Sequence, residues 1–159
     1  MDERVDLNTK VSDCAAEITI RAAVATDEGA LQAVLANIPE AAQWNPWSAA
    51  GRGWYCRVAE LGGRVCGFIA FRTVADEAEI LNLGVEEGQR RRGIASRLID
   101  EVVKECEEVG VRKVFLEVRE SNAGARMFYA ARRFTVRDQR RAYYRRPTED
   151  ALVLVRVIE

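Results

Sequence analysis

The chain has 159 residues, of which 48% are hydrophobic and 31% charged with only three prolines, a composition that predicts one globular domain and excludes disorder. It contains no histidine, which excludes an imidazole base, Ser-His-Asp or Cys-His catalysis and any histidine-containing zinc site. Its formal net charge is −1. No apolar run approaches the roughly 20 residues of a membrane span, and none forms the apolar core of a signal peptide. We therefore expect a cytoplasmic protein.

The N-terminal part of the chain predicts an extension, a strand and a helix. Residues 1–16 are polar and aperiodic, so we expect a flexible extension before a domain at 17–159. Residues 18–21 alternate like a strand, and residues 26–38 form a capped helical pattern that Pro39 ends. Residues 43–52 are aromatic and turn-forming, and they predict a short helical or irregular segment.

The middle of the chain predicts an antiparallel meander of three strands. Two strands, at 54–60 and 64–74, flank Gly62-Gly63, a pair typical of a hairpin turn. A third strand is expected at 79–85.

The C-terminal half alternates helices and strands. Apolar residues recur at helical spacing over 93–109, where Gly110 ends the pattern. A buried strand is expected at 114–118, a second helix at 122–132 and a closing hairpin at 134–144 and 151–158. The order β-α-α-β-β-β-α-β-α-β-β predicts a mixed α/β (α+β) domain.

The four cysteines are predicted to be reduced structural thiols. Cys14, Cys56, Cys66 and Cys106 are too scattered for a Cys-x-x-Cys ligand pair and too few for a disulfide scaffold of this length. Cys66 lies in an apolar strand and Cys106 on an apolar helix face, so burial is favoured over reactivity. We expect no metal site.

The basic residues gather in the second half of the chain. Residues 1–88 carry 7 basic and 14 acidic side chains, whereas residues 89–159 carry 17 and 11. Of the 24 basic residues 21 are arginine, and they cluster at 90–92, 132–133, 140–141 and 145–146. Such clusters favour phosphate groups or an acidic surface such as a ribonucleoprotein, although a solvated face has the same pattern.

One arginine cluster leads into the helix at 93–109. In Arg90-Arg91-Arg92-Gly93-Ile94-Ala95 the free N–H groups of the first helical turn and the positive end of the helix dipole can surround a pyrophosphate, and Gly93 allows close approach. The Gly-Lys-Ser/Thr of a P-loop and the full Gly-x-Gly-x-x-Gly are missing. By itself the turn could equally be a solvated charged loop.

This turn resembles the Arg/Gln-x-x-Gly-x-Gly/Ala fingerprint of the GNAT superfamily of acetyl-CoA-dependent N-acetyltransferases, which Arg90, Gly93 and Ala95 match. Within that superfamily, further segments resemble the bacterial ribosomal-protein-alanine N-acetyltransferases (RimI type): Pro46-Trp47-Ser48, Leu116 to Arg119 with Ser121-Asn122, Phe128-Tyr129, and Arg140 to Tyr144. The resemblance covers residues 17–158. It implies a single GNAT-type domain with a mixed, mostly antiparallel sheet of about seven strands, about four helices and a splay between the fourth and fifth strands.

The resemblance also implies acetyl-CoA as cosubstrate, with no metal. Its contacts fall on Leu83, Gly84, Val85, Arg91, Arg92, Gly93, Ile94, Ala95, Ser96 and Asn122. In the family the strand that holds Leu83 to Val85 is bulged, and its free backbone groups meet the pantetheine arm. Gly84 within this strand is typical of a bulge or a close approach, or of a merely weakened strand.

Three positions depart from the family pattern. Ala95 and Ser96 stand where the most similar relatives usually have glycine and a basic residue, which backbone N–H contacts tolerate. Arg133 stands where the family has a glycine that ends the helix, so the left-handed turn expected there loses its usual residue.

Acetyl transfer to an amine requires a neutral nucleophile, a polarised carbonyl and a proton for the departing thiolate. Glu117 interrupts an apolar strand, where a carboxylate is costly unless it is paired or used. The resemblance makes Glu117 the general base, acting through water, and the alternative is a structural ion pair with an arginine. It makes Tyr129 the general acid, where a helical aromatic otherwise favours core packing. It also implies that backbone N–H near Val85 stabilises the oxyanion, and Asn122 can serve as a helix cap as well.

Trp47 and Tyr143 lie in family-like segments and are expected to wall the acceptor cleft, or else to form a satellite core. The resemblance implies that the acceptor is the N-terminal alanine of a small-subunit ribosomal protein. This reaction requires no direct contact with nucleic acid and no membrane, and we expect the protein to be a monomer or a weak dimer. Two alternatives stay open: a GNAT enzyme acting on a protein lysine or small-molecule amine, and a non-catalytic CoA- or RNA-binding module. The presence of both Glu117 and Tyr129 argues against the module.

Overall fold

The structure is a computed structural model, and it describes residues 17–38 and 53–159. The strands are β1 (Ile18–Ala22), β2 (Trp54–Leu61), β3 (Arg64–Val74), β4 (Glu77–Val85), β5 (Lys113–Arg119), β6 (Thr135–Arg145) and β7 (Thr148–Val157). The α-helices of this part of the chain are α1 (Glu28–Ala36), α2 (Ile94–Glu108) and α3 (Ala123–Ala130). The expected extension at 1–16, the segment at 43–52 and Trp47 lie outside the described residues.

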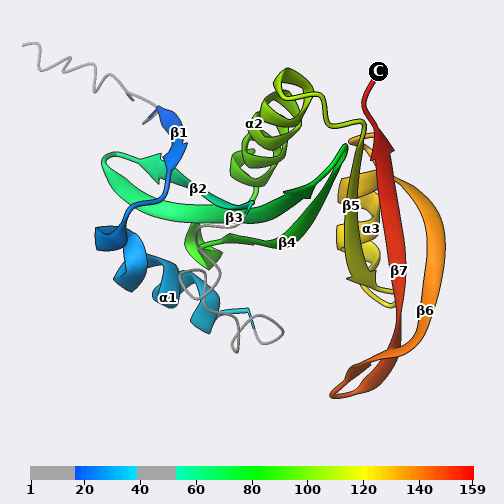
Figure 1. The fold of residues 1–159 in the computed structure, drawn as a ribbon. Helices are drawn as coiled ribbons and strands as arrows, with labels where there is room; N and C mark the ends of the chain where they lie inside the picture. The colour runs from blue at the N-terminus through cyan, green and yellow to red at the C-terminus, as the bar shows by residue number, and fades with distance from the viewer. Residues whose placement is uncertain (1–16, 39–52) are drawn as a thin grey trace, which may run out of the picture.

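The strands form one sheet in the order β1-β2-β3-β4-β5-β7-β6 (Figure 1). Neighbouring strands run antiparallel except β4 and β5, which are parallel. This confirms the mixed, mostly antiparallel sheet of about seven strands. The predicted hairpin turn is also confirmed, because Gly62 and Gly63 adopt φ of +60° and +77°, values that favour glycine.

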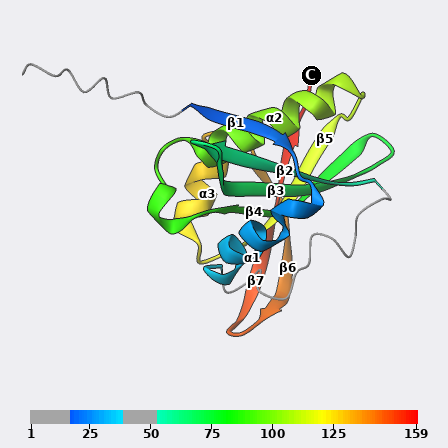
Figure 2. The same ribbon diagram turned by 90° about the vertical axis from the view of Figure 1, so that its left-hand side faces the viewer.

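Helices cover both faces of the sheet (Figure 2). Leu31, Val34 and Leu35 of α1 pack with Val58 and Phe68 on one face. The other face carries the larger core, to which α2 contributes the predicted apolar stripe. Cys66 and Cys106 are buried free thiols, as predicted. In residues 17–38 and 53–159, no helix is both long enough and apolar enough to cross a membrane.

The expected splay lies between β4 and β5. These strands pair at only three positions, from Glu77↔Lys113 to Glu79↔Phe115. Beyond Glu79, β4 continues beside β3 and β5 continues beside β7. The sheet therefore opens along its middle, as Figure 1 shows.

The bulge of β4 lies at Leu81, because the register shifts between Ala70↔Asn82 and Phe71↔Ile80. Gly84 is therefore not the bulge residue. A Cβ at Gly84 would lie 2.5 Å from Ile38 Cδ1 and 2.8 Å from Phe68 Cε1. Of the alternatives weighed for this glycine, close approach is the one observed, and the approaching groups are core side chains.

We predict that Gly84→Ala lowers the free energy of unfolding by about 1–3 kcal/mol, because the added methyl group overpacks the α1 face of the core. Gly29→Ala in α1 is the control, since a Cβ there meets nothing within 4 Å and should raise stability by about 0.5 kcal/mol. Urea denaturation of both variants measures the difference. Equal stabilities would show that the core relaxes around the new methyl group.

Candidate active site

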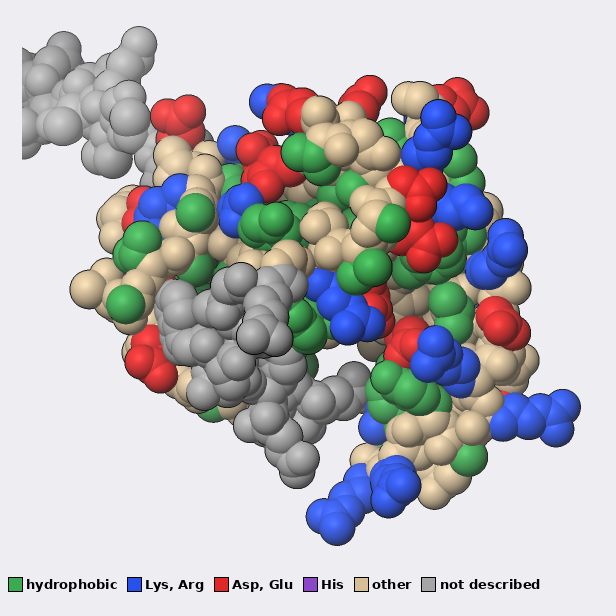
Figure 3. Space-filling view, viewed as in Figure 1, with side chains coloured by type: hydrophobic (Ala, Val, Ile, Leu, Met, Phe, Trp, Pro, Cys, Tyr) green, Lys and Arg blue, Asp and Glu red, His purple; other side chains and the backbone are tan. Residues whose placement is uncertain are grey.

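Two cavities meet where β4 and β5 separate. A cavity of about 860 Å³ lies over the start of α2 and one end of β4. A second cavity, of about 490 Å³, lies between β4, β5 and the β6–β7 hairpin. Ile38, Leu83, Ala125 and Tyr129 line both. Because they share these residues, the two cavities are contiguous, and the surface is hollowed beside the β6–β7 hairpin (Figure 3).

The 860 Å³ cavity gathers most of the residues expected to bind the cofactor. They are Leu83, Gly84, Val85, Arg91, Gly93, Ile94, Ala95 and Ser96. Arg92 is not among its lining residues, and Asn122 lines the 490 Å³ cavity instead. The grouping joins the end of β4 to the start of α2, which is the next α-helix along the chain.

The start of α2 has the features of an anion site. Gly93 is the N-cap with φ +78°, and Arg91 before it also has a positive φ of +64°. The first i→i−4 hydrogen bond runs from the Arg97 N–H to the Gly93 carbonyl at 3.1 Å, so the N–H groups before Arg97 have no acceptor within the helix. A Cβ at Gly93 would meet nothing within 4 Å, which leaves room for a ligand against the backbone.

The edge of β4 lines the path between the cavities. After Glu79 the side of β4 that faces β5 has no strand partner in the described part of the chain. Leu83 and Val85 follow on this free edge, next to the α2 turn. An extended ligand can therefore hydrogen-bond to β4 as an added strand would.

Glu117 lies at the centre of β5, on the far side of the split from β4. Leu116 and Val118 point into the α2 core, so alternation directs Glu117 to the opposite face. Its side chain is 15% exposed, and Arg140 Nε lies 3.1 Å from its Oε1. The ion pair weighed as an alternative role is therefore present. The carboxylate still lines the 490 Å³ cavity, so the pair does not remove it from the site.

A bulge in β6 brings Tyr143 to Glu117. Between Arg140↔Ala151 and Tyr144↔Glu149, three residues of β6 oppose Asp150 alone. Asp150 accepts hydrogen bonds from the Ala142 N–H at 2.8 Å and from Gln139 Nε2 at 2.7 Å, which hold the bulge.

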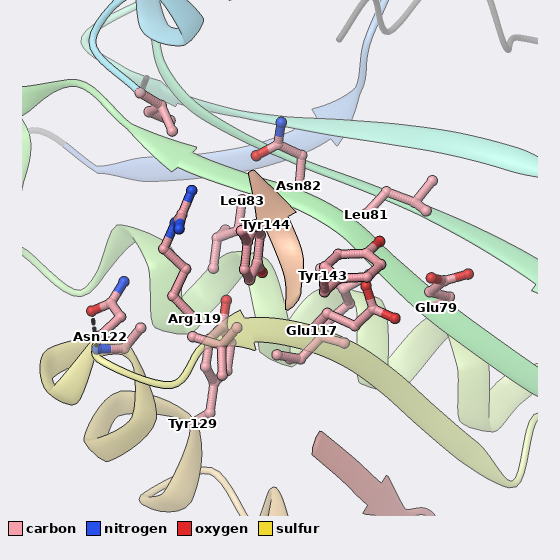
Figure 4. Close-up of a pocket in the computed structure, with 15 residues that line it drawn as sticks. Glu79, Leu81, Asn82, Leu83, Glu117, Arg119, Asn122, Tyr129, Tyr143 and Tyr144 are labelled. Carbon is pink, nitrogen blue, oxygen red and sulfur yellow. Dashed lines mark hydrogen bonds between the residues drawn. The ribbon is translucent and has the colours of Figure 1, made fainter. Parts of the chain in front are cut away.

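Tyr143 lies beside Glu117 in Figure 4. A hydrogen bond to Glu117, together with burial, raises the pKa of the Tyr143 phenol. Tyr143 lines the 490 Å³ cavity, its role beside an acceptor stays a prediction, and Trp47 lies outside the described residues.

Tyr129 extends from α3 toward the 490 Å³ cavity that Glu117 also lines (Figure 4). Its ring makes edge-to-face contacts with Phe128 and Phe134, at centroid distances of 5.2 and 5.5 Å. Burial raises the pKa of its phenol to about 12, so the group stays protonated at neutral pH. Tyr129 packs against the α2 core, on the face opposite Glu117. The two side chains line one cavity because the sheet between them is open.

The turn after α3 fixes Tyr129. The Phe134 N–H donates to the Tyr129 carbonyl at 3.1 Å and the Arg133 N–H to the Ala130 carbonyl at 3.2 Å, which together form a Schellman motif. Arg133 occupies its left-handed position with φ +66°. The turn therefore forms without the usual glycine, and the Tyr129–Phe134 ring contact joins its two ends.

We predict that Arg133→Gly raises the free energy of unfolding by about 1 kcal/mol, because a left-handed φ strains any residue that has a Cβ. The melting temperature should rise by about 2–4 °C. Arg133→Ala, which also carries a Cβ, should give no such increase. Thermal melts of the three proteins test this, and equal gains for Gly and Ala would point to the arginine charge as the cause.

Four further residues, which had no role predicted from the sequence, also line the two cavities. Arg119 stacks on Tyr144 at 4.2 Å, and both line the 490 Å³ cavity with Glu79. Arg132 lines the 860 Å³ cavity. Alternation along β5 places Arg119 on the face of Glu117. The arginine cluster at 132–133 was the sequence signal that pointed to Arg132.

Local contacts also hold the entry to α3. Asn122 Oδ1 accepts from the Ala125 N–H at 3.1 Å, so Asn122 is the expected helix cap. Glu149 accepts from the Ser121 N–H at 2.6 Å.

Across residues 17–38 and 53–159, no three His, Cys, Asp or Glu side chains are grouped so that they could hold a metal ion.

Comparison with known proteins identifies the class. Residues 23–134 match the acetyltransferase (GNAT) family, and the chain belongs to this family. It is 35% identical over 96 residues to the [ribosomal protein bS18]-alanine N-acetyltransferase of Escherichia coli K12. That match covers 58% of this chain and 64% of the relative, so it spans less than two thirds of the relative's length.

Solved structures extend the similarity over the whole described fold. The crystal structure of the Escherichia coli ribosomal-protein-S18-alanine N-acetyltransferase superposes with a TM-score of 0.81 at 28% identity, over 90% of this chain and 95% of that one. Ard1 from Thermoplasma volcanium superposes with a TM-score of 0.77 at 26% identity, over 89% of this chain and 98% of that one. The single GNAT-type domain expected from the sequence is thus confirmed.

Proposed function

We propose that this protein transfers acetyl from acetyl-CoA to the N-terminal α-amine of a protein, and that the acceptor is the N-terminal alanine of a small-subunit ribosomal protein. The observation that carries the reaction is the placement of Glu117 and Tyr129 around one opening beside the α2 anion site. The choice of acceptor rests on the sequence relatives, whose name states alanine of ribosomal protein bS18 as their acceptor.

The residues of the 860 Å³ cavity fit acetyl-CoA. Free N–H groups at the start of α2 suit a pyrophosphate, and the unpaired edge of β4 suits the amide-bearing pantetheine arm. When bound, acetyl-CoA supplies the thioester whose acetyl group is transferred. The path from α2 along β4 leads to Leu83 and Tyr129, which border both cavities, so the reacting end belongs at the split.

The two proposed catalytic groups have opposite tasks. Glu117, as a carboxylate, takes a proton from the acceptor ammonium through water, which leaves a neutral amine as nucleophile. Tyr129 holds the proton that the departing thiolate needs, because burial raises the pKa of its phenol to about 12 and the group stays protonated at neutral pH. Backbone N–H near Val85 is assigned to the developing oxyanion.

The acceptor enters from the 490 Å³ cavity. Glu79 and Glu117 both line this cavity, where they pair with Arg72 and Arg140. An acceptor ammonium group would share these carboxylates with the arginines. Tyr143 and Tyr144 flank the same space and provide its aromatic wall. Trp47 stays a predicted part of this wall.

We predict that Tyr129→Phe lowers kcat by roughly 10²- to 10⁴-fold and leaves CoA affinity and folding nearly unchanged, because only the proton donor is lost. Glu117→Gln should also slow transfer, and it should move the pH profile upward because more of the amine must deprotonate unaided. Steady-state kinetics against pH and calorimetry with CoA separate these effects. A Tyr129→Phe enzyme with the parent rate would show that Tyr129 only packs.

We predict that the acceptor is an α-amine and not a lysine. The pKa of a peptide α-amine is roughly 8 against about 10.4 for lysine, so its neutral fraction near pH 7 is about two orders of magnitude larger. A carboxylate base suits the amine that is already partly neutral. Mass spectrometry of peptides incubated with acetyl-CoA should locate the acetyl group on an N-terminal alanine. Efficient acetylation of lysine in an N-blocked peptide would overturn the acceptor and leave the acetyltransferase reaction standing.

A further inference from the structure

Arg132 is a half-buried cation on the wall of the 860 Å³ cavity. It follows α3, within the Schellman turn, and the Arg156 Nη1 group donates to its carbonyl at 3.2 Å. The turn directs its side chain back over the helix, where the guanidinium carbon lies 3.7 Å from the centroid of the Phe128 ring. Both the backbone and the guanidinium of Arg132 are therefore held in place.

The Arg132 guanidinium bridges α3 and the first turn of α2. Its Nη1 donates to the Phe128 carbonyl at 2.7 Å, and its Nη2 donates to Ser96 Oγ. Ser96 lies in the first turn of α2, among the residues whose N–H groups have no acceptor within the helix. The cation therefore stands at the edge of the anion site.

In the part of the chain that the structure describes, no carboxylate neutralises this cation. Of the other half-buried arginines, four form an ion pair with a glutamate or aspartate, namely Arg21, Arg57, Arg72 and Arg119. Arg156 instead donates to the Arg132 carbonyl, and it does not line the 860 Å³ cavity. Within the described residues Arg132 has no such partner, and its hydrogen bonds use two of the five N–H donors of a guanidinium. A half-buried charge with free donors facing a cavity calls for an anionic ligand.

We propose that Arg132 binds the pyrophosphate of the cofactor, as a cationic arm opposite the first turn of α2. This inference rests on the proposed function, because it takes acetyl-CoA as the ligand. The contact with Ser96 favours the pyrophosphate over the 3′-phosphate, since the guanidinium and the free N–H groups of α2 then share one anion. Stacking on Phe128 holds the planar fork ready for two phosphate oxygens.

Calorimetry with CoA and with dephospho-CoA, which lacks the 3′-phosphate, tests the proposal. Arg132→Gln should weaken both ligands by the same factor, about 10- to 100-fold, as expected for a lost charge-assisted hydrogen bond. Arg133→Gln is the matched control, because Arg133 is the next residue, is exposed and does not line the cavity, and it should bind both ligands like the parent protein. Unchanged affinity in Arg132→Gln would overturn the proposal. A loss confined to CoA would also overturn it, by moving the contact to the 3′-phosphate.

Protection of the parent protein provides a measurement that does not depend on a variant folding. Phenylglyoxal modifies accessible arginines, and peptide mass spectrometry reports the modified fraction of Arg132. CoA and dephospho-CoA should protect Arg132, and pantetheine, which has no phosphate, should not. Protection by none of the three would contradict the proposal. A parent protein that binds no CoA would remove the proposed function as well, whereas normal parent binding without protection would remove only the role of Arg132.

Discussion

The separation of β4 from β5 after three paired positions is the constraint on which the site depends. In a closed sheet, Glu117 and Tyr129 would lie on opposite faces with a layer of backbone between them. Because the strands part, both side chains border one cavity, and the free edge of β4 becomes available to an extended ligand. The backbone groups of β4 that do not pair with β5 are thus available to hydrogen-bond to a ligand in the gap between the two strands.

Regular elements carry Glu117 and Tyr129, and irregular turns complete their surroundings. The β6 bulge, held by Asp150, brings Arg140 and Tyr143 over Glu117. The Schellman turn at Arg133 closes the end of α3 and joins Tyr129 to Phe134. Both turns place a residue with a Cβ at positive φ, namely Ala142 and Arg133, so local backbone strain accompanies the ordering of the site.

The arginines of the second half of the chain differ in whether they form an ion pair with a carboxylate. Arg119, which lines the 490 Å³ cavity, pairs with Glu149, and Arg140 pairs with Glu117, which also lines this cavity. Arg132 faces the 860 Å³ cavity and has no carboxylate partner within residues 17–38 and 53–159. The uneven charge along the sequence therefore becomes two different environments, one in which arginines pair with carboxylates and one in which Arg132 has no carboxylate partner among the described residues.

The sequence by itself determined the elements, because apolar periodicity and glycine positions are local signals: the α2 stripe, the Gly62-Gly63 hairpin and the Arg90-to-Ala95 turn were all predictable. Glu117 was conspicuous because it interrupts an apolar strand. The resemblance, not the residue pattern alone, pointed to Tyr129.

Only the tertiary structure decided which side chains meet. Gly84 accommodates Ile38 and Phe68, Arg140 pairs with Glu117, and Arg132 reaches Ser96, which is 36 residues away in the chain. Periodicity gives the face on which a side chain lies, whereas its partner depends on strand register, on a bulge that shifts the register and on helix ends that approach in space. Those distances arise from the packing of the whole domain.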